Sequence, residues 1–209
     1  PLLSIPIISL TRCLRERGKG EEFKETSVPR LDHNELLNFT ESLLSTGGMP
    51  AADARLVAKL LVKADLRGYP GHGVTRVAPY LAWIKDGTIN LREGPKIARE
   101  GKITAVIEGN HYIGQAAAHM AMELAIRKAK EHGVGVVTLR RASHSGRLAD
   151  YMEMAADEGM IAMGAVSVGS GGGPPAGVYD LQVRGDDERK VRRATALIMT
   201  ALTDPDEWD

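Results

Sequence analysis

The sequence predicts an α/β fold of stacked helix and strand layers, preceded by an all-helical portion. Residues 31–90 carry apolar side chains at helical spacing, whereas residues 91–183 alternate short apolar runs with longer amphipathic stretches. Strands and helices that alternate in this way are typical of a layered α/β fold. Residues 1–30 are interpreted as a poorly ordered leader, and residues 184–209 as a divergent, charged helical tail.

Three helices are predicted in the first portion. Asp32 has the position of an N-cap, and Glu35, three residues later, completes a capping box. Gly47–Gly48 ends this helix. A second apolar stripe at helical spacing ends near Gly68, and a third helix is expected over about Thr75–Asp86. These helices make up the all-helical portion at 31–90.

The later portion, residues 91–183, changes to the pattern of an α/β domain. The near-continuous apolar run Val134–Leu139 predicts a strand that is buried on both faces. The remaining expected elements, in chain order, are a strand at 103–107, helices at about 115–131 and 148–158, strands at 161–168 and 178–183, and a helix at 186–202.

Composition excludes several classes of function. Hydrophobic residues make up 43% of the 209 and charged residues 26%, which is ordinary for a globular chain. The 27 basic and 27 acidic residues balance, so the charge indicates neither nucleic acid nor an anionic membrane as partner. The single cysteine, Cys13, excludes an internal disulfide and favours a reducing compartment such as the cytoplasm. No apolar run approaches the roughly 20 residues that span a bilayer.

His144 is the first candidate for chemistry. It follows the strand at Val134–Leu139 through a short loop, and carboxyl ends of strands in open α/β sheets face the ligand crevice. Gly146 allows a close approach of ligand or backbone, and Ser143 or a nearby carbonyl is a candidate to fix the imidazole tautomer. An unperturbed pKa of about 6.5 suits proton exchange near neutrality. The alternative is a loop histidine that only bonds to backbone.

His72 and Arg76 form the second candidate group. They are four residues apart at the start of a predicted helix, so they are able to share one face, which Tyr80 continues. Imidazole, guanidinium and the amides of a helix amino terminus together favour a small carboxylate. The alternative is a helix cap with an exposed arginine.

Motifs for metals and for the usual dinucleotide turn are missing from the sequence. It contains no His-Glu-x-x-His and no Cys-x-x-Cys, so no motif indicates a metal site. The glycines of Gly133–Gly135 lead into a strand instead of leaving one, and Gly171–Ala176 contains two prolines and is followed by no immediate helix. A nicotinamide cofactor would therefore bind without the usual fingerprint.

Taken in order, these segments resemble the malate/L-lactate dehydrogenase type 2 family, which includes ureidoglycolate and sulfolactate dehydrogenases. The resemblance covers roughly residues 31–168. Its matching segments are Ala64–Gly68, His72–Val74 with Arg76 and Tyr80, Gly109 with Gly114–Gln115, Ala129 with Gly133–Val134, Ser143–His144 with Gly146 and Tyr151, and Glu158–Ile161.

The resemblance implies a non-Rossmann three-layer α/β/α fold and a homodimer that binds NAD or NADP. It implies hydride transfer between a small 2-hydroxy acid, similar to malate or lactate, and the nicotinamide. It makes His144 the proton acceptor and places His72, Arg76 and Tyr80 at the substrate site. It also makes the helical portion at 31–90 the substrate side and the α/β portion at 91–183 the cofactor-binding portion. Ser167 is the nearest match to a serine that contacts the cofactor.

The chain also departs from the family. Gly71 stands where the family usually has serine, and after Ala176 the resemblance ends although family members continue further. We therefore keep a second hypothesis, that of a truncated, non-catalytic family member acting as a subunit or interaction fragment. Such a chain would bind NADH or NADPH weakly or not at all.

Overall fold

The computed structural model describes residues 2–4, 30–166 and 182–184 of the chain. The chain divides into two compact units, the first ending at Gly87 and the second beginning at Thr88. Most of the predicted leader, Ser167 and the predicted helix at 186–202 lie outside the described ranges. No helix within these ranges has both the length and the apolar character needed to cross a membrane.

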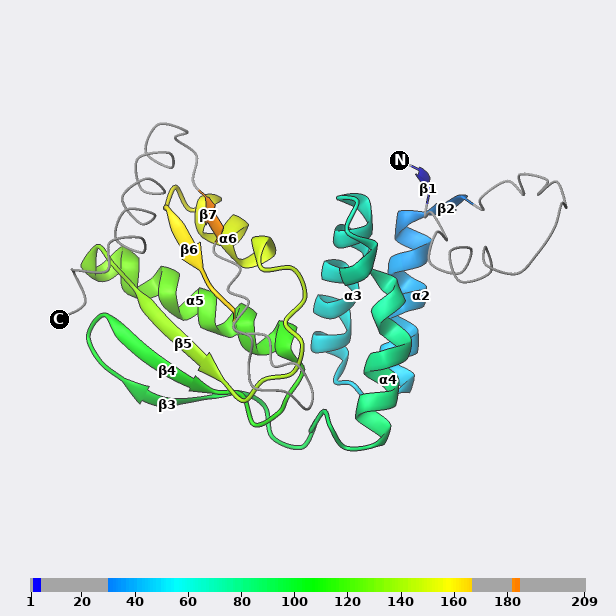
Figure 1. The fold of residues 1–209 in the computed structure, drawn as a ribbon, viewed down its shortest axis with the longest axis horizontal. Coiled ribbons are helices and arrows are strands. Elements are labelled where there is room, and N and C mark those ends of the chain that lie inside the picture. The colour runs from blue at the N-terminus through cyan, green and yellow to red at the C-terminus, as the bar shows by residue number, and fades with distance from the viewer. Residues whose placement is uncertain (1, 5–29, 167–181, 185–209) are drawn as a thin grey trace, which may run out of the picture. The chain divides into compact units, whose positions relative to one another are not determined.

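The first unit consists mainly of helices. Figure 1 shows α2, α3 and α4 running alongside one another. A short antiparallel pair of strands precedes them, and one of these strands lies within the predicted leader. The elements in chain order are β1 (Leu2–Ser4), β2 (Arg30–Asp32), α2 (His33–Thr46), α3 (Ala51–Leu66), the 3-10 turns η1 (Pro70–His72) and η2 (Val74–Arg76), and α4 (Val77–Lys85).

Local sequence signals set the ends of α2 as predicted. Asp32 is the N-cap, and its Oδ1 accepts hydrogen bonds from the amides of Asn34 (2.8 Å) and Glu35 (3.2 Å). The helix ends at Gly47, and Gly48 follows with φ +97°, a conformation that favours glycine. The buried face of α2 packs against α3. Leu44 of α2 and Leu61 of α3 are among the fully buried side chains.

The second unit contains a three-stranded mixed sheet in the order β3–β4–β5, with β3 antiparallel and β5 parallel to β4. The parallel pair is joined through α5, as in a βαβ unit. Its elements are β3 (Lys96–Glu100), β4 (Thr104–Glu108), α5 (Gly114–His132), β5 (Val136–Arg140), α6 (Ala149–Ala156), β6 (Ala162–Gly164) and β7 (Gln182–Arg184), and β6 pairs with β7.

Helix α5 forms the centre of this unit because it packs on both sides. One side places Leu124 against Ala105 and Ile107 of the sheet. The other side contacts the buried residues Tyr151 and Met152 of α6 through a second set of small and apolar residues, namely Ala118, Met122 and Ile126. The layers are therefore sheet, α5 and α6, as Figure 1 also shows. This arrangement confirms the predicted α/β class.

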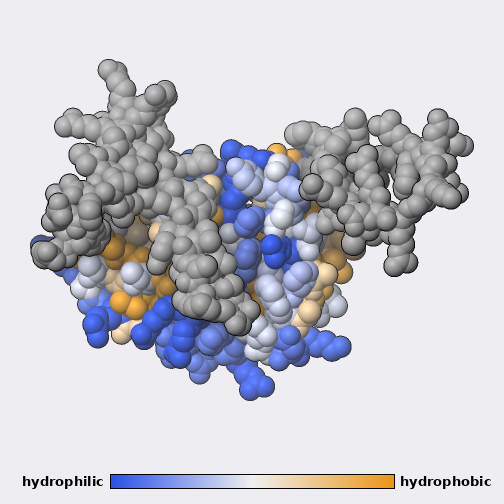
Figure 2. Space-filling view, viewed as in Figure 1, coloured by the Kyte–Doolittle hydropathy of each residue, from blue (hydrophilic) through white to orange (hydrophobic). Residues whose placement is uncertain are grey.

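Two expectations about the sheet need correction. Strand β3 is absent from the predicted elements, and the reason is that all five of its residues are exposed and give no apolar alternation. The expected burial of the 134–139 run on both faces is wrong within the described residues. Val137 and Leu139 pack toward α5, but Val136 is 51% exposed and Thr138 is exposed too. Figure 2 shows hydrophobic surface on the side of the view where β5 and β6 lie.

The α2–α3 core supplies a first test. We predict that Leu44→Ala lowers the free energy of unfolding by about 2–5 kcal/mol, because it removes a fully buried side chain from a packed interior. Phe39→Ala, on the same helix at a residue that is 62% exposed, is the control and should change it by less than about 0.5 kcal/mol. Urea unfolding followed by circular dichroism measures both. Equal losses would contradict the described packing.

Candidate active site

The candidate site begins where the parallel strands β4 and β5 end side by side. Glu108 and Arg140 are partners in the register, and each is the last residue of its strand. Beyond them the two following loops stay joined by backbone hydrogen bonds, from the amide of Gly109 to the carbonyl of Arg140 (2.9 Å), from His111 to Arg141 (2.7 Å) and from Ser143 to Tyr112 (3.1 Å). The loop that carries His144 is thereby fixed to the loop that starts α5.

These joined loops contain unusual backbone conformations. Asn110, His111 and Arg141 have φ values of 51°, 57° and 52°, the left-handed region that residues other than glycine seldom occupy. Such conformations persist where surrounding contacts hold them in place. Here they cluster within three residues of the ends of β4 and β5.

Two of them, Asn110 and Arg141, bond to the carboxylate of Glu108, whose side chain is only 5% exposed. It accepts hydrogen bonds from Nε of Arg140 (3.0 Å), Nε of Arg141 (2.9 Å) and the amide of Asn110 (3.1 Å). The hydrogen bond from Arg141, followed by that from the Asn110 amide, lowers the pKa of Glu108 from its ordinary 4.5 to about 2. Glu108 is therefore ionised at any pH near neutrality.

Ser143 and the start of α5 fix the backbone at His144. The amide of Gly114, the first residue of α5, donates a hydrogen bond to Oγ of Ser143 (2.9 Å). A Cβ atom at position 114 would lie 2.2 Å from the carbonyl oxygen of Ser143 and 2.5 Å from that of His144. Only glycine allows this approach of helix and loop.

The imidazole of His144 is half-buried and accepts a hydrogen bond from the turn that follows it. The amide of Gly146 donates to its Nδ1 at 3.3 Å, and this contact favours the neutral tautomer with its hydrogen on Nε2. Gly146 adopts φ +76°, which favours glycine at this turn. Ser143 is one of the groups expected to fix the tautomer; its Oγ accepts from the Gly114 amide, whereas the donor to Nδ1 of His144 is the Gly146 amide.

Residues of α6 and the turn before it support the part of the loop that follows His144. Arg147 is buried and forms an ion pair with the buried Asp150 (2.6 Å), with Glu153 at 3.6 Å. The hydroxyl of Tyr151 donates to the carbonyl of Ser145. Sequence reasoning missed this support, although the spacing of Arg147, Asp150 and Glu153 along one helical face was available as a signal.

The predicted group around His72 lies in the first unit, and its geometry differs from the expectation. His72 and Arg76 do not share one helical face, because they end two separate 3-10 turns, η1 and η2. Gly73 separates the turns in an extended conformation, φ −88° and ψ −158°. Pro70 at the start of η1 sets the first turn apart from the later helix.

Arg76 is held by the turn before it. Its Nε donates to the carbonyl of Gly71 at 2.6 Å, and the neighbouring Thr75 hydroxyl donates to the carbonyl of Pro70 at 2.7 Å. Within the described part of the chain, no carboxylate forms an ion pair with the Arg76 guanidinium. Its two terminal nitrogens therefore remain suited to an outside carboxylate.

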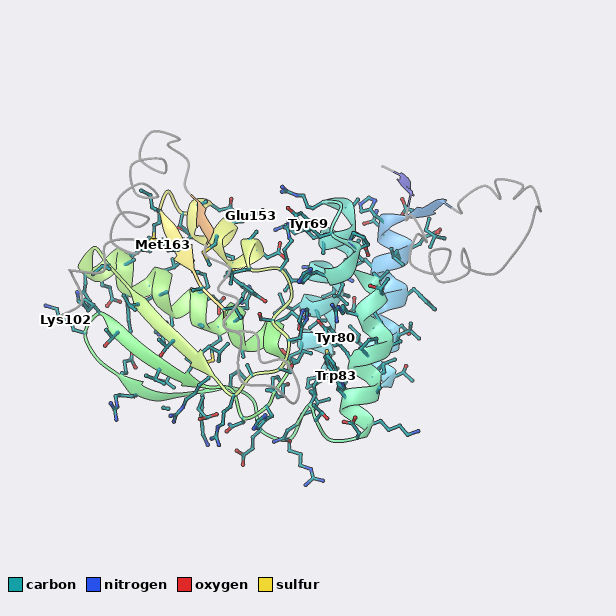
Figure 3. All side chains as sticks on the ribbon, viewed as in Figure 1. Tyr69, Tyr80, Trp83, Lys102, Glu153 and Met163 are labelled. Carbon is teal, nitrogen blue, oxygen red and sulfur yellow. The ribbon has the colours of Figure 1, made fainter. Side chains whose placement is uncertain are left out.

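The amides at the start of this segment are not all open to a ligand, contrary to expectation. The Val74 amide, the first of η2, donates to Oδ2 of Asp65 at 2.8 Å. Tyr80 lies further along on α4 and is fully buried, with its ring centroid 5.8 Å from that of Trp83 (Figure 3). His72 and Arg76 are half-buried and thus more accessible than Tyr80.

The predicted site residues do not all belong to the same unit. His72, Arg76 and Tyr80 belong to the first unit and His144 to the second. Ser167 lies outside the described residues. Among those residues, no three histidine, cysteine or acidic side chains gather in a way that would hold a metal ion.

Comparison with known proteins assigns this architecture to a class. The family model described as malate/L-lactate dehydrogenase matches residues 31–179, and the chain belongs to that family. It is similar to a malate dehydrogenase of Pyrococcus abyssi, with 41% identity over 146 residues that cover 70% of this chain and 39% of the relative. It is also similar to the L-sulfolactate dehydrogenase of Methanocaldococcus jannaschii, with 44% identity over 119 residues covering 57% and 35%.

Solved structures give the same fold. The malate dehydrogenase of Pyrococcus horikoshii OT3 superposes with a TM-score of 0.69 at 32% identity, over 80% of this chain and 50% of that one. The chain thus spans well under two thirds of the length of the relatives it matches.

The Glu108 contacts predict a pH dependence. The pKa of Glu108 is lowered in the folded state, so its contribution to stability is present above pH 4.5 and is lost as the pH falls toward about 2. We expect wild type to exceed Glu108→Gln in urea midpoint at neutral pH, and the difference to vanish between those two values. Glu93→Gln, at a side chain that is 68% exposed, is the control without such a difference. A gap that stays constant with pH would refute the role of this carboxylate.

Proposed function

We propose that this protein takes part in the oxidation of a small 2-hydroxy acid, similar to malate or lactate, with NAD or NADP as hydride acceptor, and in the reverse reduction of the 2-keto acid. The observation that carries the proposal is His144, fixed by Gly146 and the start of α5 at the carboxyl end of a parallel strand. The family relation supports it, because the matching relatives are named malate and sulfolactate dehydrogenases.

His144 would act as the acid and base at the substrate oxygen. In its neutral tautomer, Nε2 carries the hydrogen and suits binding of a 2-keto oxygen. Taking the proton of a 2-hydroxyl at Nε2 requires the ring hydrogen to move to Nδ1. That move opens the 3.3 Å contact with Gly146. The long Gly146 bond makes this exchange less costly than breaking a short one.

Arg76 would bind the substrate carboxylate. Its guanidinium is anchored through Nε to Gly71, which leaves the two terminal nitrogens in a plane that matches the two oxygens of a carboxylate. His72 ends the adjacent turn and would orient the substrate oxygens. Because Tyr80 is fully buried, we give it a supporting role beneath this segment in place of direct contact.

Two groups bear on the nucleotide site. The Gly114 amide at the start of α5 is bonded to Ser143, and Ser167, the proposed cofactor contact, lies outside the described residues. NAD or NADP is therefore proposed from the family relation, and when bound it supplies the hydride acceptor. The homodimer implied by the resemblance and a cytoplasmic location, favoured by the single cysteine, are proposals of the same kind.

The role of His144 is tested by substitution. We predict that His144→Ala lowers turnover of malate or lactate at least about 100-fold with a smaller effect on cofactor affinity, which is typical for loss of a general acid or base. His119→Ala, a half-buried histidine on α5, is the control and should keep most of the activity. Steady-state rates with NAD⁺ and with NADP⁺ measure the effect. Unchanged turnover in the His144 variant would sink the assignment.

The role of Arg76 is tested by a change that keeps the charge. We predict that Arg76→Lys raises the substrate KM about tenfold or more and leaves NADH and NADPH binding unchanged, because lysine lacks the planar fork. Arg55→Lys is the control, since Arg55 is engaged with Glu41 in the same unit. Equal KM values for wild type and the Arg76 variant would show that the carboxylate is bound elsewhere.

A further inference from the structure

Asp65 has an unusual position near the end of α3. Its Oδ2 accepts the hydrogen bond from the Val74 amide, while its Oδ1 is buried and has no hydrogen-bond partner within the described ranges. Burial raises the pKa of the Asp65 carboxyl above its ordinary value. A carboxylate with one buried, unsatisfied oxygen is costly for stability, so its place requires an explanation.

The backbone at Gly73 fits directly against this carboxylate. A Cβ atom at position 73 would lie 1.8 Å from Oδ1 and 2.2 Å from Cγ of Asp65. The φ of Gly73, −88°, is one that other residues also adopt, so glycine is needed here for space. Asp65 and Gly73 therefore form a matched contact at the point where η1 ends and η2 begins.

We propose that Asp65 is the positioning residue for the segment between His72 and Arg76, which it holds by accepting the Val74 amide and by closing against Gly73. This inference rests on the proposed function of that segment. Val74 opens η2 and Arg76 ends it, and Arg76 in turn bonds back to Gly71. One acceptor at Asp65 thus holds the middle of a closed turn whose two ends carry the imidazole and the guanidinium.

The position of Asp65 also determines how the segment recognises an anion. Its carboxylate takes the Val74 amide, so that amide is not available to a ligand. Under the proposed function, the substrate carboxylate is bound by the side chains of Arg76 and His72. Asparagine at position 65 keeps an acceptor oxygen and the shape of the side chain but removes the charge. The Asp65→Asn variant therefore separates the contribution of the hydrogen bond from that of the charge.

Hydrogen exchange tests the positioning role without any activity. In the 209-residue chain, we expect Asp65→Ala to accelerate exchange of the Val74 amide at least about tenfold, as follows from loss of one charge-assisted hydrogen bond. Asp65→Asn should restore protection. Asp53→Ala, at a half-buried carboxylate on the same helix, is the control, and the Leu61 amide should stay protected in all three. Gly73→Ala should reproduce Asp65→Ala.

Kinetics supply the second readout. Asp65→Ala should raise the KM for the hydroxy acid about tenfold with kcat changed less than about threefold, and Asp65→Asn should return KM close to wild type. Unaltered Val74 exchange in Asp65→Ala, or failure of Asp65→Asn to restore it, overturns the positioning role. If the wild-type chain turns over no hydroxy acid, the proposed function fails, while the exchange result still decides for or against Asp65.

Discussion

The buried carboxylate of Glu108 is the interaction on which the second unit's candidate site depends. It binds side chains from the end of β5 and an amide beyond the end of β4, so it fixes two strand ends and the loops that leave them. The strained conformations at Asn110, His111 and Arg141 lie around it. The loop from Arg141 leads directly to Ser143 and His144, so the ion pair fixes the point at which this loop leaves the sheet.

The two candidate segments share the same kind of local contact. In each, an acidic side chain accepts a backbone amide from a turn close to a functional residue, Glu108 from Asn110 and Asp65 from Val74. In each, a glycine then permits close approach, Gly114 beside His144 and Gly73 beside Asp65. Charge-assisted bonds to amides hold turns without long side chains, and this leaves room for a ligand. Neither contact rests on apolar packing alone.

Local sequence patterns predicted much of the fold. They predicted less of the candidate site, because its contacts join residues that are far apart in the sequence. The ends of α2 follow from Asp32 and Gly47, because caps are read from a few neighbouring residues. Strand β3 was missed because its residues are all exposed and show no apolar alternation. It is a strand because its backbone pairs with β4. The two arginine partners of Glu108 are 32 and 33 residues away, and Gly146 contacts His144 only after the loop has folded. The break between η1 and η2 likewise depends on Asp65, a tertiary contact that helical spacing does not reveal.

In both units the amide that opens a helical segment beside a candidate residue is already bonded within the protein, Gly114 to Ser143 and Val74 to Asp65. These two amides are therefore already engaged, and the proposed function assigns substrate recognition to imidazole and guanidinium side chains. Side chains are better suited than fixed amides to a reaction in which the bound oxygen changes from hydroxyl to carbonyl, because an imidazole exchanges a proton at that oxygen. A guanidinium keeps its charge throughout such a reaction and is suited to the carboxylate, which the hydroxy acid and the keto acid share.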